Sequence, residues 1–135
     1  MTDDIAMMYQ EMILEHYKNP QNAGTLDQPS VKHREYNPLC GDDLEMFLTI
    51  KDGKVEDIKF KGKGCAISQA SASLLTEKVK GMSIKDIQEL KKEDVLELLG
   101  IELSAVRLKC AMLALDTIKN AIHIHGQYVE EGKNG

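Results

Sequence analysis

Three cysteines and one aspartate could do chemistry together in this sequence. The cysteines are Cys40, Cys65 and Cys110, and Asp42 follows the first of them by two residues. A cysteine thiolate binds soft metal ions and attacks sulfur donors. Three thiolates and one carboxylate suit a tetrahedral zinc ion or an iron-sulfur centre. These residue types therefore point to metal binding combined with sulfur chemistry.

Each cysteine stands where the chain can present it to a ligand. Proline and glycine in residues 37–42 (NPLCGD) predict a turn that leads Cys40 into a strand. Cys65 follows a Gly-Lys-Gly segment at the expected exit of the next strand, so a hairpin would return it to the neighbourhood of Cys40. Cys65 and Cys110 are also expected near helix N-termini, where the helix dipole favours a thiolate, and Lys109 would act in the same direction. We therefore expect these side chains to converge.

Asp42 is the expected fourth ligand of this site. A carboxylate is a harder donor than a thiolate and suits iron or zinc less well, which we interpret as a means of release. Asp43 is expected to point the other way once the strand begins. The alternative interpretation is that the cysteines are small buried hydrophobic residues and that Asp42 only closes a turn. The shared placement of the three thiols favours the metal site.

The histidines do not complete this site. His16 lies late in an expected helix, and His33 lies in a polar segment. His123 and His125 are two residues apart near the end of another expected helix, so their side chains face different directions. We expect structural or solvated roles for all of them.

The composition excludes several classes of protein. The chain has 135 residues, and its net charge of −5 comes from 22 acidic and 17 basic residues that are interspersed. There is no basic block to indicate a nucleic-acid partner, no apolar run of the ~20 residues that a membrane span needs, and no signal peptide. Three widely spaced cysteines match a secreted disulfide framework poorly. We therefore expect a soluble cytoplasmic protein with reduced thiols.

Hydrophobic periodicity predicts helices on both sides of a β-hairpin. One face of the hairpin carries the alternating residues Leu44, Met46, Leu48 and Ile50, and an Asp52-Gly53 turn reverses the chain. The expected elements are a helix over 3–18, an edge strand over 31–36, strands over 44–51 and 55–61, and helices over 66–81, 83–90 and 93–99. A final helix is expected from about 104 to a stop at Gly126.

The final helix carries a stripe formed by Leu108, Met112, Leu115, Ile118 and Ile122. Cys110 lies off that stripe, beside small residues. The order of the elements predicts an α+β fold in a single domain over 1–135. We expect a small antiparallel sheet of about three strands, covered on one face by several helices, with an N-terminal helix and a long C-terminal helix.

Four segments resemble the IscU, SufU and NifU-type scaffolds for iron-sulfur cluster assembly. They are residues 17–24 (YKNPQNAG), 37–42 (NPLCGD), 62–68 (GKGCAIS) and 107–110 (RLKC). The resemblance implies that Cys40, Asp42, Cys65 and Cys110 surround one exposed site on which a [2Fe-2S] cluster assembles. It also implies a cysteine desulfurase as the donor of persulfide sulfur and apo iron-sulfur proteins as acceptors. The oligomeric state is left open by the sequence, with a homodimer as one alternative.

The residues leave the first sulfur acceptor open. A nucleophilic and reachable thiolate is needed, which fits Cys40 on its loop or Cys110 beside Lys109. Many IscU proteins have a histidine where Lys109 stands, whereas SufU-like members have a lysine. A protonated lysine is not a metal ligand, so the site would depend more heavily on Asp42.

The sequence differs from the pattern of these families in two further places. The segment that a dedicated chaperone recognises in IscU proteins contains two prolines, and both are absent from residues 103–107 (LSAVR). The resemblance therefore does not imply chaperone-driven release. SufU-like proteins usually carry an insertion before the third cysteine, and the interval between Cys65 and Cys110 has no room for it.

Three functions follow from these patterns. The first is a scaffold, which is not an enzyme, for a transferable cluster. The second is a zinc-dependent sulfurtransferase of the SufU-like kind, in which one cysteine leaves the metal to accept sulfur. The third is a structural zinc domain without sulfur traffic. Lys109 favours the second function, and the absent insertion favours the first.

Overall fold

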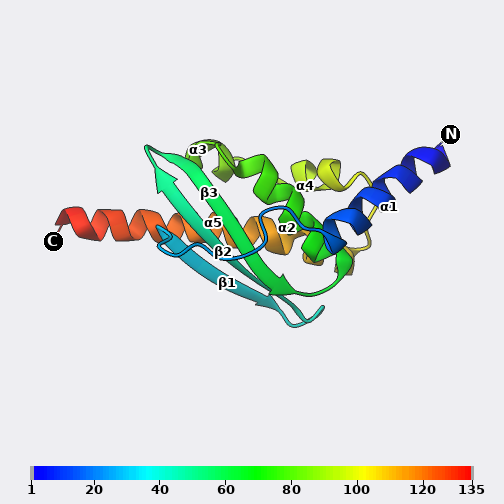
Figure 1. The fold of residues 1–135 in the computed structure, drawn as a ribbon, viewed down its shortest axis with the longest axis horizontal. Helices are drawn as coiled ribbons and strands as arrows, with labels where there is room; N and C mark the ends of the chain where they lie inside the picture. Colours follow the sequence, from blue (N-terminus) through cyan, green and yellow to red (C-terminus); the bar gives the residue numbers. More distant parts are fainter. Residues whose placement is uncertain (1, 135) are drawn as a thin grey trace.

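The computed structural model describes residues 2–134, and these form five helices and one sheet (Figure 1). No helix among the described residues is apolar over enough of its length to span a membrane. In chain order the elements are α1 (Thr2–Lys18), β1 (Val31–Asn37), β2 (Asp42–Lys51), β3 (Lys54–Lys63), α2 (Ala66–Val79), α3 (Ile84–Gln88), α4 (Lys92–Leu99) and α5 (Ala105–Asn134).

The sheet is antiparallel, with the strand order β1-β2-β3. Asp52 and Gly53 close the β2–β3 turn with φ angles of 53° and 73°, the left-handed values that a two-residue hairpin turn requires. The inward alternation holds for Leu44, Met46 and Leu48, but a register shift between Thr49 and Ile50 leaves Ile50 half-buried. The predicted three-stranded sheet, including its edge strand, is confirmed.

Helices α2 and α5 pack on one face of the sheet, and α1 packs on α2. In Figure 1, α5 runs behind the strands along most of the molecule. The largest side chains that are almost fully buried between these layers are Leu44, Met46, Leu48, Ile58, Leu75, Leu115 and Ile118. This arrangement is the α+β layout that the sequence predicts, with helices on one side of the sheet.

The prediction that Gly126 ends the last helix is wrong. Helix α5 continues through this position to Asn134. A glycine inside a helix costs only about 1 kcal/mol relative to alanine, because it loses more backbone freedom on folding. Residues 127–134, as far as the structure describes the chain, include neither a proline nor a left-handed residue, so nothing in the backbone stops the helix at this point.

The buried face of α5 is wider than the predicted stripe. Leu115 and Ile118 are buried as expected, but Leu108 and Met112 are only half-buried, and Cys110 is 2% exposed. The reason is that α5 packs against both α2 and the sheet, so a broad sector of small and large residues is covered. Cys110 therefore belongs to the interior side of the helix.

Candidate metal site

The turn between β1 and β2 positions Cys40 through hydrogen bonds to Asn37. The Asn37 side-chain oxygen accepts from the Leu39 N–H at 3.0 Å, and the Gly41 N–H donates to the Asn37 carbonyl oxygen at 2.8 Å. Gly41 has a φ of 70°, which a glycine adopts without steric cost. The Asn37 amide also lies 3.6 Å from Cys40 Sγ, where its N–H can donate to the sulfur. Cys40 is thus held at a half-buried position.

Asp42 is the first residue of β2, and it is fully buried. It shares its face of the strand with Leu44, so its side chain points inward, toward the helix layer. Its Oδ1 accepts a hydrogen bond of 2.8 Å from the Cys65 N–H. Gly64 makes room for this contact, because a Cβ there would overlap Asp42 Oδ1 and lie 2.7 Å from Ser68 Oγ. The carboxylate is therefore fixed by the backbone around Cys65.

Cys65 is the N-cap residue of α2, which confirms its predicted place at a helix N-terminus. Its sulfur accepts from the Ser68 N–H at 3.5 Å and lies 3.7 Å from Asp42 Oδ2. The sulfur thus sits at the positive end of the helix dipole. Cys110 differs from the prediction. It lies beyond the first turn of α5, which begins at Ala105, and the dipole is weak there.

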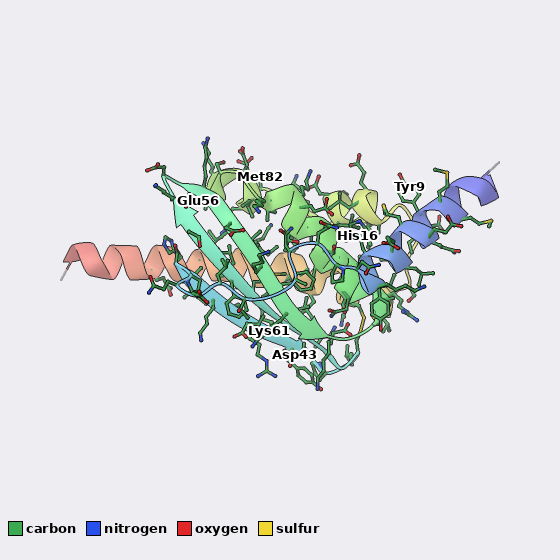
Figure 2. All side chains as sticks on the ribbon, viewed as in Figure 1. Tyr9, His16, Asp43, Glu56, Lys61 and Met82 are labelled. Carbon is green, nitrogen blue, oxygen red and sulfur yellow. A yellow bond between two sulfur atoms is a disulfide. The ribbon has the colours of Figure 1, made fainter. Side chains whose placement is uncertain are left out.

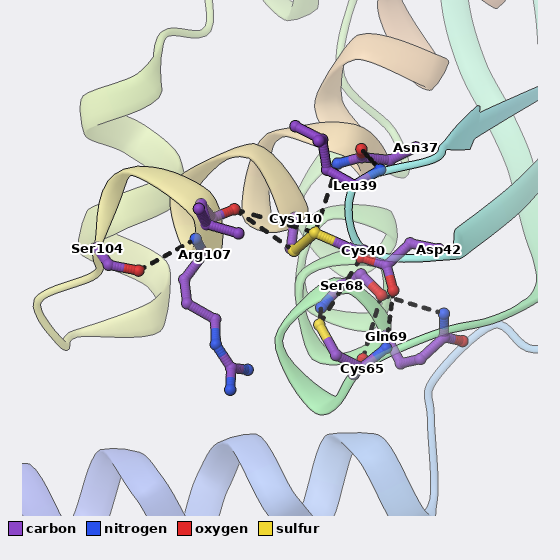
Figure 3. The surroundings of a disulfide bond; sticks show 11 residues. Asn37, Leu39, Cys40, Asp42, Cys65, Ser68, Gln69, Ser104, Arg107 and Cys110 are labelled. Atoms are coloured by element: carbon purple, nitrogen blue, oxygen red, sulfur yellow. Dashed lines mark hydrogen bonds between the residues drawn. A yellow bond between two sulfur atoms is a disulfide. The ribbon is translucent and has the colours of Figure 1, made fainter.

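The sulfur atoms of Cys40 and Cys110 are joined as a disulfide (Figure 3). Their Cα atoms are 6.6 Å apart, within the range that disulfides span. The prediction that all three thiols are reduced is therefore wrong for this structure, in which Cys65 is the free cysteine. Cys40 and Cys110 meet because the turn before β2 packs against the start of α5, a contact that sequence spacing does not reveal.

Four potential ligands meet at this place. The ligand atoms of Cys40, Asp42 and Cys110 all lie within 4.8 Å of one another, and Cys65 adjoins them through Asp42. Once the disulfide is reduced, this donor set of thiolates and one carboxylate suits zinc or iron-sulfur ligation. Solvent reaches it through Cys40 and Cys65, because Asp42 and Cys110 are buried. The site is therefore less exposed than the sequence suggested.

A groove of about 450 Å³ lies between the β1–β2 turn and α5 and is lined by residues next to Cys40 and Cys110 in the sequence. Lys109 is exposed and lines this groove, whereas Cys110 beside it in the sequence is buried. The groove is lined by Tyr36, Asn37, Pro38, Leu39, Leu108, Lys109, Met112, Leu113 and Asp116. Sequence reasoning missed this groove, although the apolar Pro38-Leu39 pair inside a turn was a signal, since Leu39 remains 66% exposed.

Asp43 lies on the opposite face of β2 from Asp42, as predicted. Arg34 donates to its carboxylate through two nitrogens, and this hydrogen bonding holds the pKa of Asp43 below its usual value. Asp43 and Lys61 both lie on the outer side of the sheet (Figure 2). Asp43 is therefore occupied by an ion pair outside the site.

Three histidines contact polar partners away from the cysteines, and one of them is His123, whose Nε2 lies 3.3 Å from Gln127 Nε2. His16 Nδ1 lies 2.7 Å from Ser73 Oγ, a contact between α1 and α2, and His33 Nε2 lies 3.0 Å from Glu35 Oε2. The residue group that could hold a metal, among the described residues, contains no histidine. These contacts agree with the structural roles expected for His16 and His33.

Comparison with known proteins identifies the class of this chain. Residues 8–131 match the family model of the NifU-like N-terminal domain. The chain is 40% identical over 120 residues to the iron-sulfur cluster assembly scaffold protein IscU of Escherichia coli, covering 86% of this chain and 92% of that protein. It is 42% identical over 119 residues to the iron-sulfur cluster assembly enzyme IscU of Drosophila melanogaster, covering 85% of this chain and 76% of that protein.

Solved structures show the same fold. A SufU protein from Fervidobacterium islandicum AW-1 superposes with a TM-score of 0.75 at 24% identity, over 85% of this chain and 96% of its own. A NifU-like N-terminal structure from Brucella abortus gives 0.74 at 23% identity, over 88% and 94%. The shared fold and the sequence match over most of the chain point to the same family. The chain belongs to the NifU-like N-terminal domain family, together with the curated IscU proteins.

Proposed function

We propose that this protein is a scaffold on which an iron-sulfur cluster assembles before it passes to other proteins. The observation that carries the proposal is the meeting of Cys40, Asp42 and Cys110 within 4.8 Å, with Cys65 against the same carboxylate. Family membership and the scaffold names of its relatives support it. The cargo we propose is a [2Fe-2S] cluster, held by these four residues and built in the cytoplasm.

The sulfur donor in this proposal is a cysteine desulfurase. Cys40 is its first acceptor, because it lies half-buried on a turn whereas Cys110 is 2% exposed. Leu39 and Lys109 line the groove beside it and would contact the approaching donor. We assign Lys109 an auxiliary role there, since its ammonium group can neutralise a negative charge but cannot bind a metal.

A zinc-dependent sulfurtransferase is the second candidate. The same donors suit tetrahedral zinc, and Cys40 on its turn is the ligand placed to leave the metal and accept sulfur. Loss of that contact would leave Asp42, Cys65 and Cys110 on the zinc. A sulfurtransferase would use the same site residues as a scaffold, so only the product of the reaction distinguishes the two functions.

Anaerobic reconstitution separates the two functions. Reduced protein is mixed with ferrous iron, L-cysteine, a desulfurase and a dithiol reductant, and the visible absorption is followed before and after apo-ferredoxin is added. The scaffold predicts an absorbing cluster that moves to the ferredoxin. A protein that forms no cluster but activates the desulfurase strongly when loaded with zinc alone would contradict the scaffold and support the sulfurtransferase.

A further inference from the structure

The bonded pair Cys40 and Cys110 bears on a step that cluster assembly requires. Sulfur from a desulfurase arrives as zero-valent sulfur in a persulfide, whereas a cluster contains sulfide, which is two electrons more reduced. We propose that the protein itself makes this reduction, with Cys40 as the persulfide carrier and Cys110 as the thiol that releases sulfide. The inference rests on the proposed function and adds a sulfide-releasing activity to it.

The step balances as a thiol–disulfide exchange. The Cys110 thiol first loses its proton to solvent, and its Sγ attacks the Sγ of the Cys40 persulfide. A bond forms between the two Sγ atoms, and the bond from Cys40 Sγ to the outer sulfur breaks. The outer sulfur leaves with the electron pair and its own proton as HS⁻. It is reduced by two electrons, and the two cysteine sulfurs are oxidised to the observed disulfide.

The positions of the two cysteines fit these unequal roles. Cys40 lies half-buried on its turn, where a donor can reach it. Cys110 is 2% exposed, so an external persulfide reaches it poorly while Cys40 already contacts it. The carbonyl oxygen of Val106 lies 3.5 Å from Cys110 Sγ and 4.0 Å from Cys40 Sγ, and so faces both sulfurs. The attacking atom therefore needs no large movement to reach its target.

Cys65 is placed differently from this pair. It is the free cysteine, and its sulfur is held as the N-cap of α2 by the Ser68 N–H at 3.5 Å. Its sulfur also falls outside the group of ligand atoms that lie within 4.8 Å of one another. Cys65 thus remains a ligand for iron while the other two cysteines exchange sulfur.

The disulfide must be reduced before the site can hold a cluster, because a disulfide sulfur is not a thiolate ligand. A dithiol reductant supplies the two electrons and leaves as its own disulfide. Each sulfide thus consumes one dithiol. The oxidised protein is therefore the form of the scaffold that remains after one sulfide is released. In this form the sulfurs of Cys40 and Cys110 are joined in the disulfide, which protects them from further oxidation.

A single turnover without iron tests the proposal. Fully reduced protein, freed of added thiol, receives sulfur from a desulfurase and L-cysteine, and sulfide is assayed while thiol labelling and intact mass follow the cysteines. Wild type is expected to release about one sulfide per chain and to form the Cys40–Cys110 disulfide. Cys110→Ser is expected to keep one extra sulfur on Cys40 and to release sulfide at least ~10-fold more slowly. Asp27→Asn, at an exposed position outside the site, is the control and should behave as wild type.

Other outcomes would overturn the proposal. These are sulfide release from Cys110→Ser at the wild-type rate, a persulfide that persists on wild type, or no sulfur on Cys40 at all. A separate arm supplies wild type with sodium sulfide, ferrous iron and a dithiol. Cluster formation in this arm upholds the scaffold even when the single turnover fails, whereas failure here counts against the scaffold itself.

Discussion

The Asp42 carboxylate accepts a hydrogen bond of 2.8 Å from the backbone N–H of Cys65. The bond links the start of β2 to the start of α2. Asp42 therefore connects these two elements and also lies beside the cysteine sulfurs. Asp42 is fully buried, and its second oxygen lies 3.7 Å from Cys65 Sγ. The hydrogen bond from Cys65 holds the Asp42 carboxylate in place before a cluster binds. Removal of this carboxylate is therefore expected to affect both the stability of the fold and the binding of the cluster.

Replacing Asp42 is expected to separate these two effects. Asp42→Ala leaves the Cys65 N–H without a partner and should lower the free energy of unfolding by about 1–3 kcal/mol. Asp42→Asn retains an acceptor oxygen and should cost less. Because the carboxylate is the proposed release ligand, cluster loss should be several-fold slower in Asp42→Ala than in wild type. Denaturant unfolding and the decay of visible absorption measure the two effects, and unchanged or faster decay would count against Asp42 in release.

Gly64 is expected to tolerate no side chain. Its φ is 157°, and a Cβ there would overlap Asp42 Oδ1 and crowd Ser68 Oγ. Gly64→Ala should lower the free energy of unfolding by more than ~2 kcal/mol and change the rate of cluster loss, since the carboxylate must move. Gly53→Ala is the control, because Gly53 has a φ of 73° but open space around its Cβ position. It should cost about 1 kcal/mol and leave the cluster unaffected. Equal losses of unfolding free energy in Gly64→Ala and Gly53→Ala would contradict this explanation.

Gly126→Ala tests whether α5 continues through this position. A Cβ at Gly126 would meet open space, so alanine should gain helix propensity without a clash. We expect about 0.5–1 kcal/mol of added stability by thermal or denaturant unfolding. Destabilisation would instead mean that this glycine ends the helix.

Asp116 makes stability depend on pH. Asp116 is exposed, but its partial desolvation and the neighbouring charge of Glu35 raise its pKa above the ordinary value, although Lys119 acts in the opposite direction. Its ionisation therefore opposes folding at pH values above the raised pKa, and this cost disappears as the pH falls below the unfolded value. Asp116→Asn should be more stable than wild type at pH 7, with a smaller difference in acid. Unfolding at both pH values, with Asp27→Asn outside α5 as a control, checks this, and an equal difference at both would contradict it.

Loading with metal is not expected to be required for folding. Leu44, Leu48 and Ile58 are fully buried in a core shared by the sheet and two long helices, and none of them depends on the site. The reduced, metal-free protein should therefore unfold cooperatively, which circular dichroism during denaturation measures. A chain that is unfolded without metal would support a structural zinc domain instead.

The β2–β3 hairpin and its place beside the cysteines could be predicted from the sequence. The alternation of hydrophobic and polar residues, together with the Asp-Gly turn, leaves few other ways to pair the two strands. The burial of Asp42 was also within reach, since it shares strand parity with Leu44. The groove and the Cys40–Cys110 bond were not, because both depend on how the turn after β1 packs against α5. Local patterns do not encode that packing.

Iron K-edge X-ray absorption of the reconstituted protein tests most directly whether these four side chains hold the cargo. We predict a first shell of sulfur with an added oxygen contribution, which disappears in Asp42→Ala. The Cys40→Ser, Cys65→Ser and Cys110→Ser variants should each lose sulfur from that shell. Iron shells unchanged by all four substitutions would contradict the account.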